Sequence, residues 1–195
     1  MSGEDQLAVG GRLTPGFLHC FSASLTGTCS ILTGADLQTH PDTDGRILPM
    51  VRAEVVDDQD KRLPAGEAGA FRVRSHGMAE RLYKDQARDN GDKIRDGWAY
   101  TGDLARISAD GFLSIVGRTS DMIIRGGANV YPAEVEAALL KHDHVKDVAV
   151  TGFDDAELGQ ELAAFIVASG SLSEAELVSH CRVTLPPDKR PRKYV

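Results

Sequence analysis

Short glycine-containing stretches place charged side chains where they can contact a ligand. Asp103 follows Gly102, and a carboxylate just after a glycine turn can accept hydrogen bonds from both hydroxyls of a sugar diol. Arg118 follows Gly117 at the expected end of a strand, where its guanidinium can donate to ribose or phosphate oxygens. Each pattern is common on protein surfaces when it occurs alone, so the order and spacing of the whole set carry the argument.

A further glycine-rich stretch lies in the last third of the chain. Gly126 and Gly127 lack a Cβ, which lets the backbone approach a ligand closely. The following helix is expected to begin at Pro132, because a fixed φ and a missing N–H are tolerated in a first helical turn. We interpret Glu134 and Glu136 as a favourable charge pattern at the start of this helix rather than as an acid–base pair.

The elements before these residues are expected to be rich in β-structure. Apolar and polar residues alternate in runs typical of half-buried strands, at residues 51–55, 70–74, 100–107 and 112–116. Residues 108–111 end in glycine and predict a hairpin turn between the last two runs. We also predict a short apolar helix at 17–21, a strand or loop at 22–34, and a short helix at 83–90.

In the rest of the chain the pattern becomes mixed. Val135 and Leu139 recur at helical spacing, and Ser173 with Glu176 has the spacing of a capping box that opens another helix, to about residue 181. Short strands are predicted at 122–124, 145–150 and 162–167. We therefore predict an α+β fold, with a β-rich domain over residues 1–118 and a small α/β domain over residues 119–195.

Composition narrows the class of protein. With 195 residues and a formal net charge of -7, the chain lacks the basic character of a nucleic-acid binder. The short basic stretch from Lys189 to Lys193 lies beside prolines and is expected to be a solvated terminal segment. The three cysteines form no C-x-x-C pair, so we predict neither zinc nor disulfides, and a reduced, cytoplasmic compartment. No apolar run approaches the ~20 residues of a membrane span, and the polar N-terminus does not resemble a signal peptide.

Taken together, these stretches resemble the adenylate-forming superfamily. The resemblance lies in Gly97-Trp98, Thr101-Gly102-Asp103, Asp110-Gly111-Phe112, Gly117-Arg118, Asp121 to Ile124, Gly126-Gly127 and Tyr131 to Glu136. It extends from about residue 44 onward and is strongest to the fatty-acyl and aryl CoA ligases. It implies that residues 1–118 are the end of the family's large domain, with part of a β-barrel subdomain. Residues 119–195 would then be the small, mobile C-terminal domain.

The resemblance also implies a reaction and a set of partners. In this family a carboxylate attacks ATP to give acyl-AMP and pyrophosphate, and a thiol, usually that of CoA, then displaces AMP. By position, Asp103 would bind the ribose hydroxyls of AMP, Arg118 would contact the same nucleotide, and Ser120 would be the hinge of the small domain. Gly126 and Gly127 fall on the loop that lines the CoA channel. The implied partners are a small carboxylate, ATP and CoA, with Mg²⁺ in the intact enzyme.

The sequence departs from the family at two places. Residues 21–27 occupy the position of the family's Tyr-Gly-x-Thr-Glu motif, as an altered copy or as the join left by a deletion. In an altered copy, Leu25 would stand in place of the acidic residue that holds magnesium, and with either origin that carboxylate is absent. The family's catalytic lysine is not found, since Lys189 and Lys193 lie in the Pro-rich stretch that precedes its place. We therefore assign no catalytic or metal-binding residue and expect the chain alone to be inactive.

Other interpretations stay open at this point. The chain is compatible with a shortened, non-catalytic relative that acts as an interaction module, or with a decayed reading frame. It is also compatible with an adenylation domain that feeds a carrier protein instead of CoA. Surface that the rest of the large domain covers in the family predicts self-association. The acyl substrate is not encoded in these residues, because the family's acyl pocket lies upstream of them.

Overall fold

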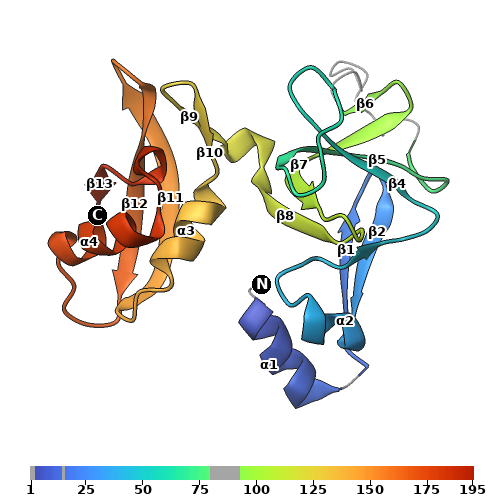
Figure 1. The fold of residues 1–195 in the computed structure, drawn as a ribbon, viewed down its shortest axis with the longest axis horizontal. Helices are drawn as coiled ribbons and strands as arrows, with labels where there is room; N and C mark the ends of the chain where they lie inside the picture. Colours follow the sequence, from blue (N-terminus) through green and yellow to red (C-terminus); the bar gives the residue numbers. More distant parts are fainter. Residues whose placement is uncertain (1–2, 15, 80–92) are drawn as a thin grey trace. The chain divides into compact units, whose positions relative to one another are not determined.

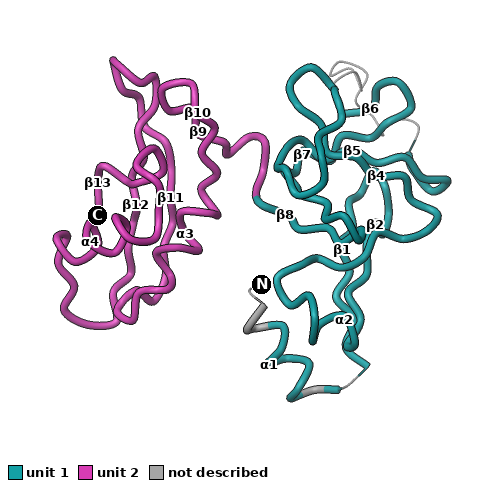
Figure 2. The backbone as a smooth tube through the Cα atoms, viewed as in Figure 1, with its two compact units in different colours: residues 1–116 teal, residues 117–195 magenta. Residues whose placement is uncertain are grey.

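The computed structural model describes residues 3–14, 16–79 and 93–195, and the expected helix at 83–90 lies outside this range. The chain divides into two compact units, residues 1–116 and 117–195, which we call unit 1 and unit 2 (Figures 1 and 2). The division falls between Val116 and Gly117, whereas the sequence predicts a boundary after residue 118. The mixed α and β architecture predicted from the sequence is confirmed, and the sheets of the described residues do not close into a barrel.

Unit 1 begins with helix α1 (Gly3–Leu13) and a three-stranded antiparallel sheet. The sheet has the order β1-β2-β3, with strands at Leu18–Ala23, Gly27–Thr33 and Arg46–Ile47. Helix α2 (Gly34–Thr39) follows β2 and starts at a capping box formed by Thr33 and Asp36. The short helix predicted at 17–21 is wrong. Residues 18–21 alternate in exposure and pair with β2, so cross-strand pairing decides the structure of a run too short to show a period.

The second sheet of unit 1 has the order β4-β5-β7-β6, with β8 also paired to β7. Its strands are β4 (Arg52–Val56), β5 (Gly69–Arg74), β6 (Ile94–Arg95), β7 (Trp98–Ile107) and β8 (Leu113–Arg118). The predicted hairpin between β7 and β8 is confirmed, because the Ser108 N–H donates to the Phe112 carbonyl at 2.9 Å and Gly111 has a φ of 87°. One core joins the two sheets, formed by Cys29, Val51, Val55, Phe71, Val73, Ala105 and Leu113.

Unit 2 is a sheet with two helices packed on it (Figure 1). The strand order is β10-β9-β12-β11, with β13 parallel to β12. The elements after the short 3-10 helix η2 (Thr119–Asp121) are β9 (Ile123–Arg125), β10 (Ala128–Val130), α3 (Pro132–Leu139), β11 (Val145–Asp155), β12 (Gly159–Ala168), α4 (Glu174–Thr184), η3 (Pro187–Lys189) and β13 (Lys193–Tyr194). Both predicted helices are confirmed, and α4 extends beyond the predicted end near residue 181.

The helices of unit 2 bury the residues that the helical spacing selects. Val135 and Leu139 of α3 are fully buried, and Leu177 and Cys181 of α4 lie four residues apart on the buried face. The Ser173 hydroxyl accepts from the Glu176 N–H, and the Glu176 carboxylate accepts in return, as the predicted capping box requires. The two helices pack against β11 and β12 and fix these strands, next to which the candidate residues of unit 2 lie.

The basic C-terminal stretch is solvated only in part, because Arg192 and Lys193 have exposed side chains but the stretch also contacts the rest of unit 2. The Lys189 ammonium lies 2.8 Å from a carboxylate oxygen of Glu134. The Arg190 guanidinium donates to the Leu185 and Arg182 carbonyls near the end of α4. The Arg192 N–H donates to the Leu162 carbonyl of β12. The stretch is therefore docked on unit 2 by ion pairs and hydrogen bonds that local sequence cannot reveal.

Candidate functional site

Asp103 lies at an irregularity in β7. Leu104 pairs with Ala70 and Tyr100 pairs with Arg72, so residues 101–103 of β7 lie opposite Phe71 alone. Such a bulge redirects side chains and is common beside binding sites. Gly102, with a φ of 80°, supplies the left-handed backbone that the bulge needs.

The bulge fixes Asp103 in a nearly buried position. The residue is 6% exposed, and its N–H donates to the Thr101 hydroxyl oxygen at 3.1 Å. Burial raises the pKa of the Cys29 thiol above its ordinary value, the hydrogen bond with Thr26 lowers it, and the charge of Asp103 raises it. Asp103 is therefore held in place within β7, and its charge adds to the burial that disfavours the thiolate of Cys29.

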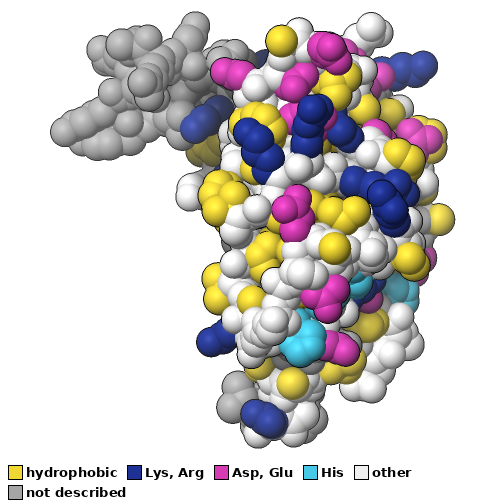
Figure 3. Space-filling view, turned by 90° about the vertical axis from the view of Figure 1, so that its left-hand side faces the viewer, with side chains coloured by type: hydrophobic (Ala, Val, Ile, Leu, Met, Phe, Trp, Pro, Cys, Tyr) yellow, Lys and Arg dark blue, Asp and Glu magenta, His cyan; other side chains and the backbone are white. Residues whose placement is uncertain are grey.

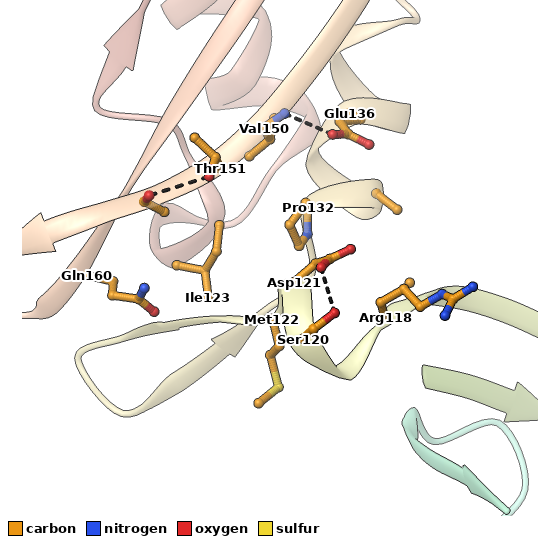
Figure 4. Close-up of a pocket in the computed structure, with 13 residues that line it drawn as sticks. Arg118, Ser120, Asp121, Met122, Ile123, Pro132, Glu136, Val150, Thr151 and Gln160 are labelled. Atoms are coloured by element: carbon orange, nitrogen blue, oxygen red, sulfur yellow. Dashed lines mark hydrogen bonds between the residues drawn. The ribbon is translucent and has the colours of Figure 1, made fainter. Parts of the chain in front are cut away.

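The other candidate residues all lie in unit 2, where a pocket of about 380 Å³ is formed by the η2 segment, the start of α3, β11 and β12. Figure 4 shows Arg118 and Ser120 at one end of this pocket and Gln160 at the other, with Ile123 between them. The Ser120 hydroxyl donates to the Asp121 carboxylate at 2.8 Å. The structure thus brings two of the sequence-predicted residues, Arg118 and Ser120, into one pocket.

For two residues that line the pocket, the sequence pattern does not predict the role: Glu136 is interpreted as a helix-start charge, and Gln160 is not selected. The Glu136 carboxylate accepts from the Val150 N–H at 2.8 Å, so it ties α3 to β11 rather than simply favouring the first helical turn. The side-chain amide oxygen of Gln160, Oε1, accepts from the Ile124 N–H at 2.8 Å and holds β9 against β12. Both partners are backbone groups far along the chain, for which the sequence carries no signal. These two hydrogen bonds fix the positions of the elements that line the pocket.

Gly126 and Gly127 form the two-residue turn of the β9–β10 hairpin, since Arg125 pairs with Ala128. Their φ angles are 56° and 84°, which is the left-handed backbone of a tight hairpin turn and favours glycine at both positions. The Gly126 N–H donates to the Leu158 carbonyl at 2.8 Å. Neither glycine lines the pocket, so the structure places this turn apart from Arg118 and Ser120 within unit 2.

Comparison with known proteins relates both units to one family. Residues 134–195 match the AMP-binding enzyme C-terminal domain. A long-chain-fatty-acid–CoA ligase of Salmonella typhimurium is 37% identical over 160 residues, which cover 81% of this chain and 28% of the ligase. ATP-bound MatB from Rhodopseudomonas palustris superimposes on all of this chain and 39% of its own, with a TM-score of 0.88 and 27% identity.

A third relative carries a reaction intermediate. The o-succinylbenzoate CoA synthetase MenE of Bacillus subtilis, solved with the acyl-adenylate OSB-AMP, matches 98% of this chain and 39% of its own, with a TM-score of 0.84 and 26% identity. The chain belongs to the adenylate-forming superfamily. It spans about 28% of the length of the curated ligase, so it corresponds to the C-terminal region of such enzymes.

A metal site of the adenylate-forming type does not fit the residues that the structure describes. Leu25, which stands where the resemblance places the magnesium-holding carboxylate, is apolar and 9% exposed in the turn between β1 and β2. Within the described ranges, no group of three or more His, Cys, Asp or Glu side chains is arranged to share a metal ion.

Charged and hydrophobic side chains are interspersed on the surface that can be seen in one view. On the face drawn in Figure 3, Lys and Arg side chains form separate groups among Asp, Glu and hydrophobic side chains, without a continuous basic track. Among the described residues, helices are too short or too polar to cross a membrane. The three cysteines are free thiols, two of them buried.

Proposed function

We propose that this chain forms the C-terminal part of the nucleotide and acceptor sites of an ATP-dependent acid–thiol ligase. In the first step a carboxylate oxygen of the substrate attacks the α-phosphorus of ATP, and pyrophosphate leaves. In the second step the thiol of CoA attacks the acyl carbon, its proton is lost to solvent or base, and AMP leaves. In this proposal residues 1–118 end the large domain and residues 119–195 are the small domain.

The observation that carries the proposal is the bulge that buries Asp103. A carboxylate held by β7 and by Gly102 loses little freedom when it accepts hydrogen bonds from two ribose hydroxyls, so its position favours a nucleoside. We assign the ribose of AMP to Asp103. We assign Arg118 to the same nucleotide, because it is among the residues that line the pocket of unit 2 and a guanidinium can donate to a nucleotide oxygen.

The acceptor step is assigned to the rest of unit 2. Ser120 lies in a single turn of 3-10 helix with exposed side chains, a short segment on which a domain can rotate. The Gly126–Gly127 turn presents backbone without side chains, which suits a narrow channel for the pantetheine arm of CoA. In the intact enzyme, magnesium would neutralise the phosphates of ATP. Leu25 has no oxygen atom that could bind the metal, so this proposal assigns the magnesium ligands to other residues.

Two further assignments belong to the same proposal. The free cysteines fit a reducing, cytoplasmic location. Large apolar side chains are exposed at Leu18, Met50 and Val183, with 58%, 67% and 87% of their surface accessible, and they support self-association. Light scattering of the 195-residue chain tests the second point, and a monodisperse monomer would argue against it.

The experiment for the main proposal uses AMP and the 195-residue chain. Titration of AMP should shift the backbone NMR signals around Asp103 and Arg118. Asp103→Asn keeps the shape of the side chain but gives up one strong acceptor, and we expect it to weaken AMP binding by about tenfold. Lys141→Met, at an exposed position outside the pocket, is the matched control and should leave the shifts unchanged.

A second readout is ATP–pyrophosphate exchange by the native polypeptide that carries this sequence. Exchange that requires a carboxylate and falls with Asp103→Asn supports the ligase. AMP affinity equal in the wild type and in Asp103→Asn would refute the assignment of the ribose to Asp103. The absence of carboxylate-dependent exchange in the native polypeptide would refute the ligase and favour a non-catalytic relative.

A further inference from the structure

Arg125 makes contacts that neither the nucleotide site nor the hinge explains. It is the last residue of β9, directly before the Gly126–Gly127 turn. One arm of its guanidinium, Nη2, lies 2.8 Å from Oε1 of Glu161 in β12. The Glu161 side chain is 1% exposed, so its carboxylate is removed from water, and Arg125 is the nearer of the two arginines beside it.

The other arm of the same guanidinium reaches the C-terminal segment. Nη1 donates to the Pro187 carbonyl at 3.0 Å and to the Asp188 carbonyl at 2.8 Å. These carbonyls lie in η3, which follows α4 and precedes β13. One planar group therefore joins the hairpin, the central strand β12 and the segment that runs to the end of the described chain.

Further contacts make this junction specific for arginine. Arg192 brings a second guanidinium within 3.7 Å of the Glu161 carboxylate from the same C-terminal segment. Lysine at position 125 would keep the charge opposite Glu161 but could not hold a carboxylate and two carbonyls in one fixed plane. The fork of arginine is thus what couples β9 to η3.

We infer that Arg125, held by buried Glu161, is a positioning residue that makes the Gly126–Gly127 turn and the 187–192 segment move as one body. The inference rests on the proposed function in one respect, because that function assigns the turn to the acceptor channel. In that setting Arg125 keeps the channel loop in the conformation that receives CoA and transmits any displacement of the C-terminal segment to it. The coupling itself is a property of this chain and can be measured without turnover.

The first experiment measures amide hydrogen exchange in the 195-residue chain carrying Arg125→Lys. The Gly126 N–H, bonded to Leu158, and the Arg192 N–H, bonded to Leu162, should both exchange about tenfold faster. The Val150 N–H, bonded to Glu136, should be unchanged, because it belongs to the packed base of the unit. Arg182→Lys makes the same substitution at an exposed position of α4 and should alter none of the three rates.

Acceleration at Gly126 alone or at Arg192 alone would overturn the coupling, and so would no acceleration at either. If Arg125→Lys unfolds unit 2, the amides of Gly126, Arg192 and Val150 all exchange faster. The same measurement is then made on Glu161→Gln. Glutamine keeps the shape and an acceptor for Arg125, so exchange at Gly126 and Arg192 should rise together, by about threefold. A rise confined to one of the two amides in Glu161→Gln would again refute the inference.

The second experiment tests the consequence for the acceptor step in the native polypeptide. Arg125→Lys should raise KM for CoA about tenfold more than it raises KM for ATP, whereas a loss of folded protein would lower kcat for both half-reactions equally. If Arg125→Lys accelerated amide exchange at both Gly126 and Arg192 but left KM for CoA unchanged, Arg125 would couple the two segments without a role in the acceptor step. A wild-type polypeptide that makes neither acyl-AMP nor thioester would refute the proposed function, while the exchange experiment would still decide the coupling.

Discussion

Each unit contains an arginine–glutamate pair on its sheet, and the two pairs differ mainly in the surroundings of the carboxylate. In unit 1, Arg72 lies 2.6 Å from Glu54, and the two side chains are 14% and 22% exposed. In unit 2, Arg125 lies 2.8 Å from Glu161, and the exposures are 17% and 1%. Glu54 keeps contact with water, whereas Glu161 has exchanged water for protein. Similar distances therefore describe interactions with different consequences for stability.

The surroundings of the arginines extend the contrast. The Arg72 guanidinium lies 4.7 Å from the Trp98 ring centroid and donates to the Tyr100 hydroxyl at 3.0 Å, on the outer side of its sheet. Its role is to cover aromatic rings on a surface. Arg125 instead joins separate segments of backbone around a buried charge. The Arg72–Glu54 pair is therefore one contact among several on its sheet. The Arg125–Glu161 pair, in contrast, connects β9, β12 and η3.

The largest predicted effect comes from removing each arginine in turn. Arg125→Met leaves the Glu161 carboxylate buried without its close partner and should lower the free energy of unfolding of unit 2 by about 3–5 kcal/mol. Arg72→Met should cost unit 1 only about 1 kcal/mol, because Glu54 can regain water. Urea titration measures both: Trp98 is the one tryptophan, so its fluorescence follows unit 1, and far-UV circular dichroism follows the whole chain.

A matched control is Arg125→Met combined with Glu161→Leu, which removes both charges. The double variant should recover most of the lost stability, since it leaves no uncompensated charge in the interior. Equal losses for Arg72→Met and Arg125→Met would show that the burial of the carboxylate does not decide the cost, and the contrast between the units would fail.

These two pairs also mark the limit of what the sequence predicts. Alternation gave β4, β5, β7 and β8, because a period of two is a local property. Family resemblance selected Asp103, Arg118, Ser120 and the Gly126–Gly127 turn, and no local pattern would have ranked them. Glu161 and its partner lie 36 residues apart, and Lys189 and Glu134 lie 55 apart. Such pairs are created by tertiary packing, so the docked C-terminal stretch could not be recognised from its own composition.

A moderate effect is expected at Glu136, which tests whether a carboxylate matters here as a charge or as an acceptor. Glu136→Leu leaves the Val150 N–H without its side-chain partner and should cost about 1–3 kcal/mol of unit 2 stability. Glu136→Gln keeps a carbonyl oxygen at the same position and should cost less than about 0.5 kcal/mol. Urea unfolding followed by circular dichroism compares them. An equal loss in both variants would mean that charge, and not hydrogen bonding, holds α3 to β11.

A smaller effect is expected from the ion pair that docks the C-terminal stretch. The side chains of Lys189 and Glu134 are 21% and 37% exposed, so water and salt screen their attraction. Lys189→Met should lower the stability of unit 2 by about 0.5 kcal/mol, and the difference should shrink at high salt. Lys141→Met removes a charge of the same sign at an exposed position of unit 2 and serves as the control. If Lys189→Met lowered the stability of unit 2 as much as Arg125→Met does, the Lys189–Glu134 pair would behave like the buried Arg125–Glu161 pair, and this prediction would be wrong.

The smallest effects concern the capping boxes that open α2 in unit 1 and α4 in unit 2. Hydrogen bonds from Ser173 lower the pKa of Glu176 below its ordinary value of 4.5, and those from Thr33 lower the pKa of Asp36 below 3.8. A carboxylate with a lower pKa in the folded state stabilises the fold above its unfolded pKa, and this contribution is lost as the pH falls through the folded pKa. Glu176→Gln and Asp36→Asn should therefore lower the melting temperature slightly at about pH 7 and have no effect once the wild-type carboxyl is protonated.

Thermal melts at stepped pH distinguish the two boxes. The difference between wild type and Glu176→Gln should begin to shrink as the pH drops below about 4.5, because the unfolded chain then starts to hold that proton. For Asp36→Asn the difference should begin to shrink only below about 3.8. A difference that stayed constant through both ranges would show that the boxes stabilise their helices by shape alone. In that case the contrast between the units would rest on their arginine pairs and not on carboxylates in general.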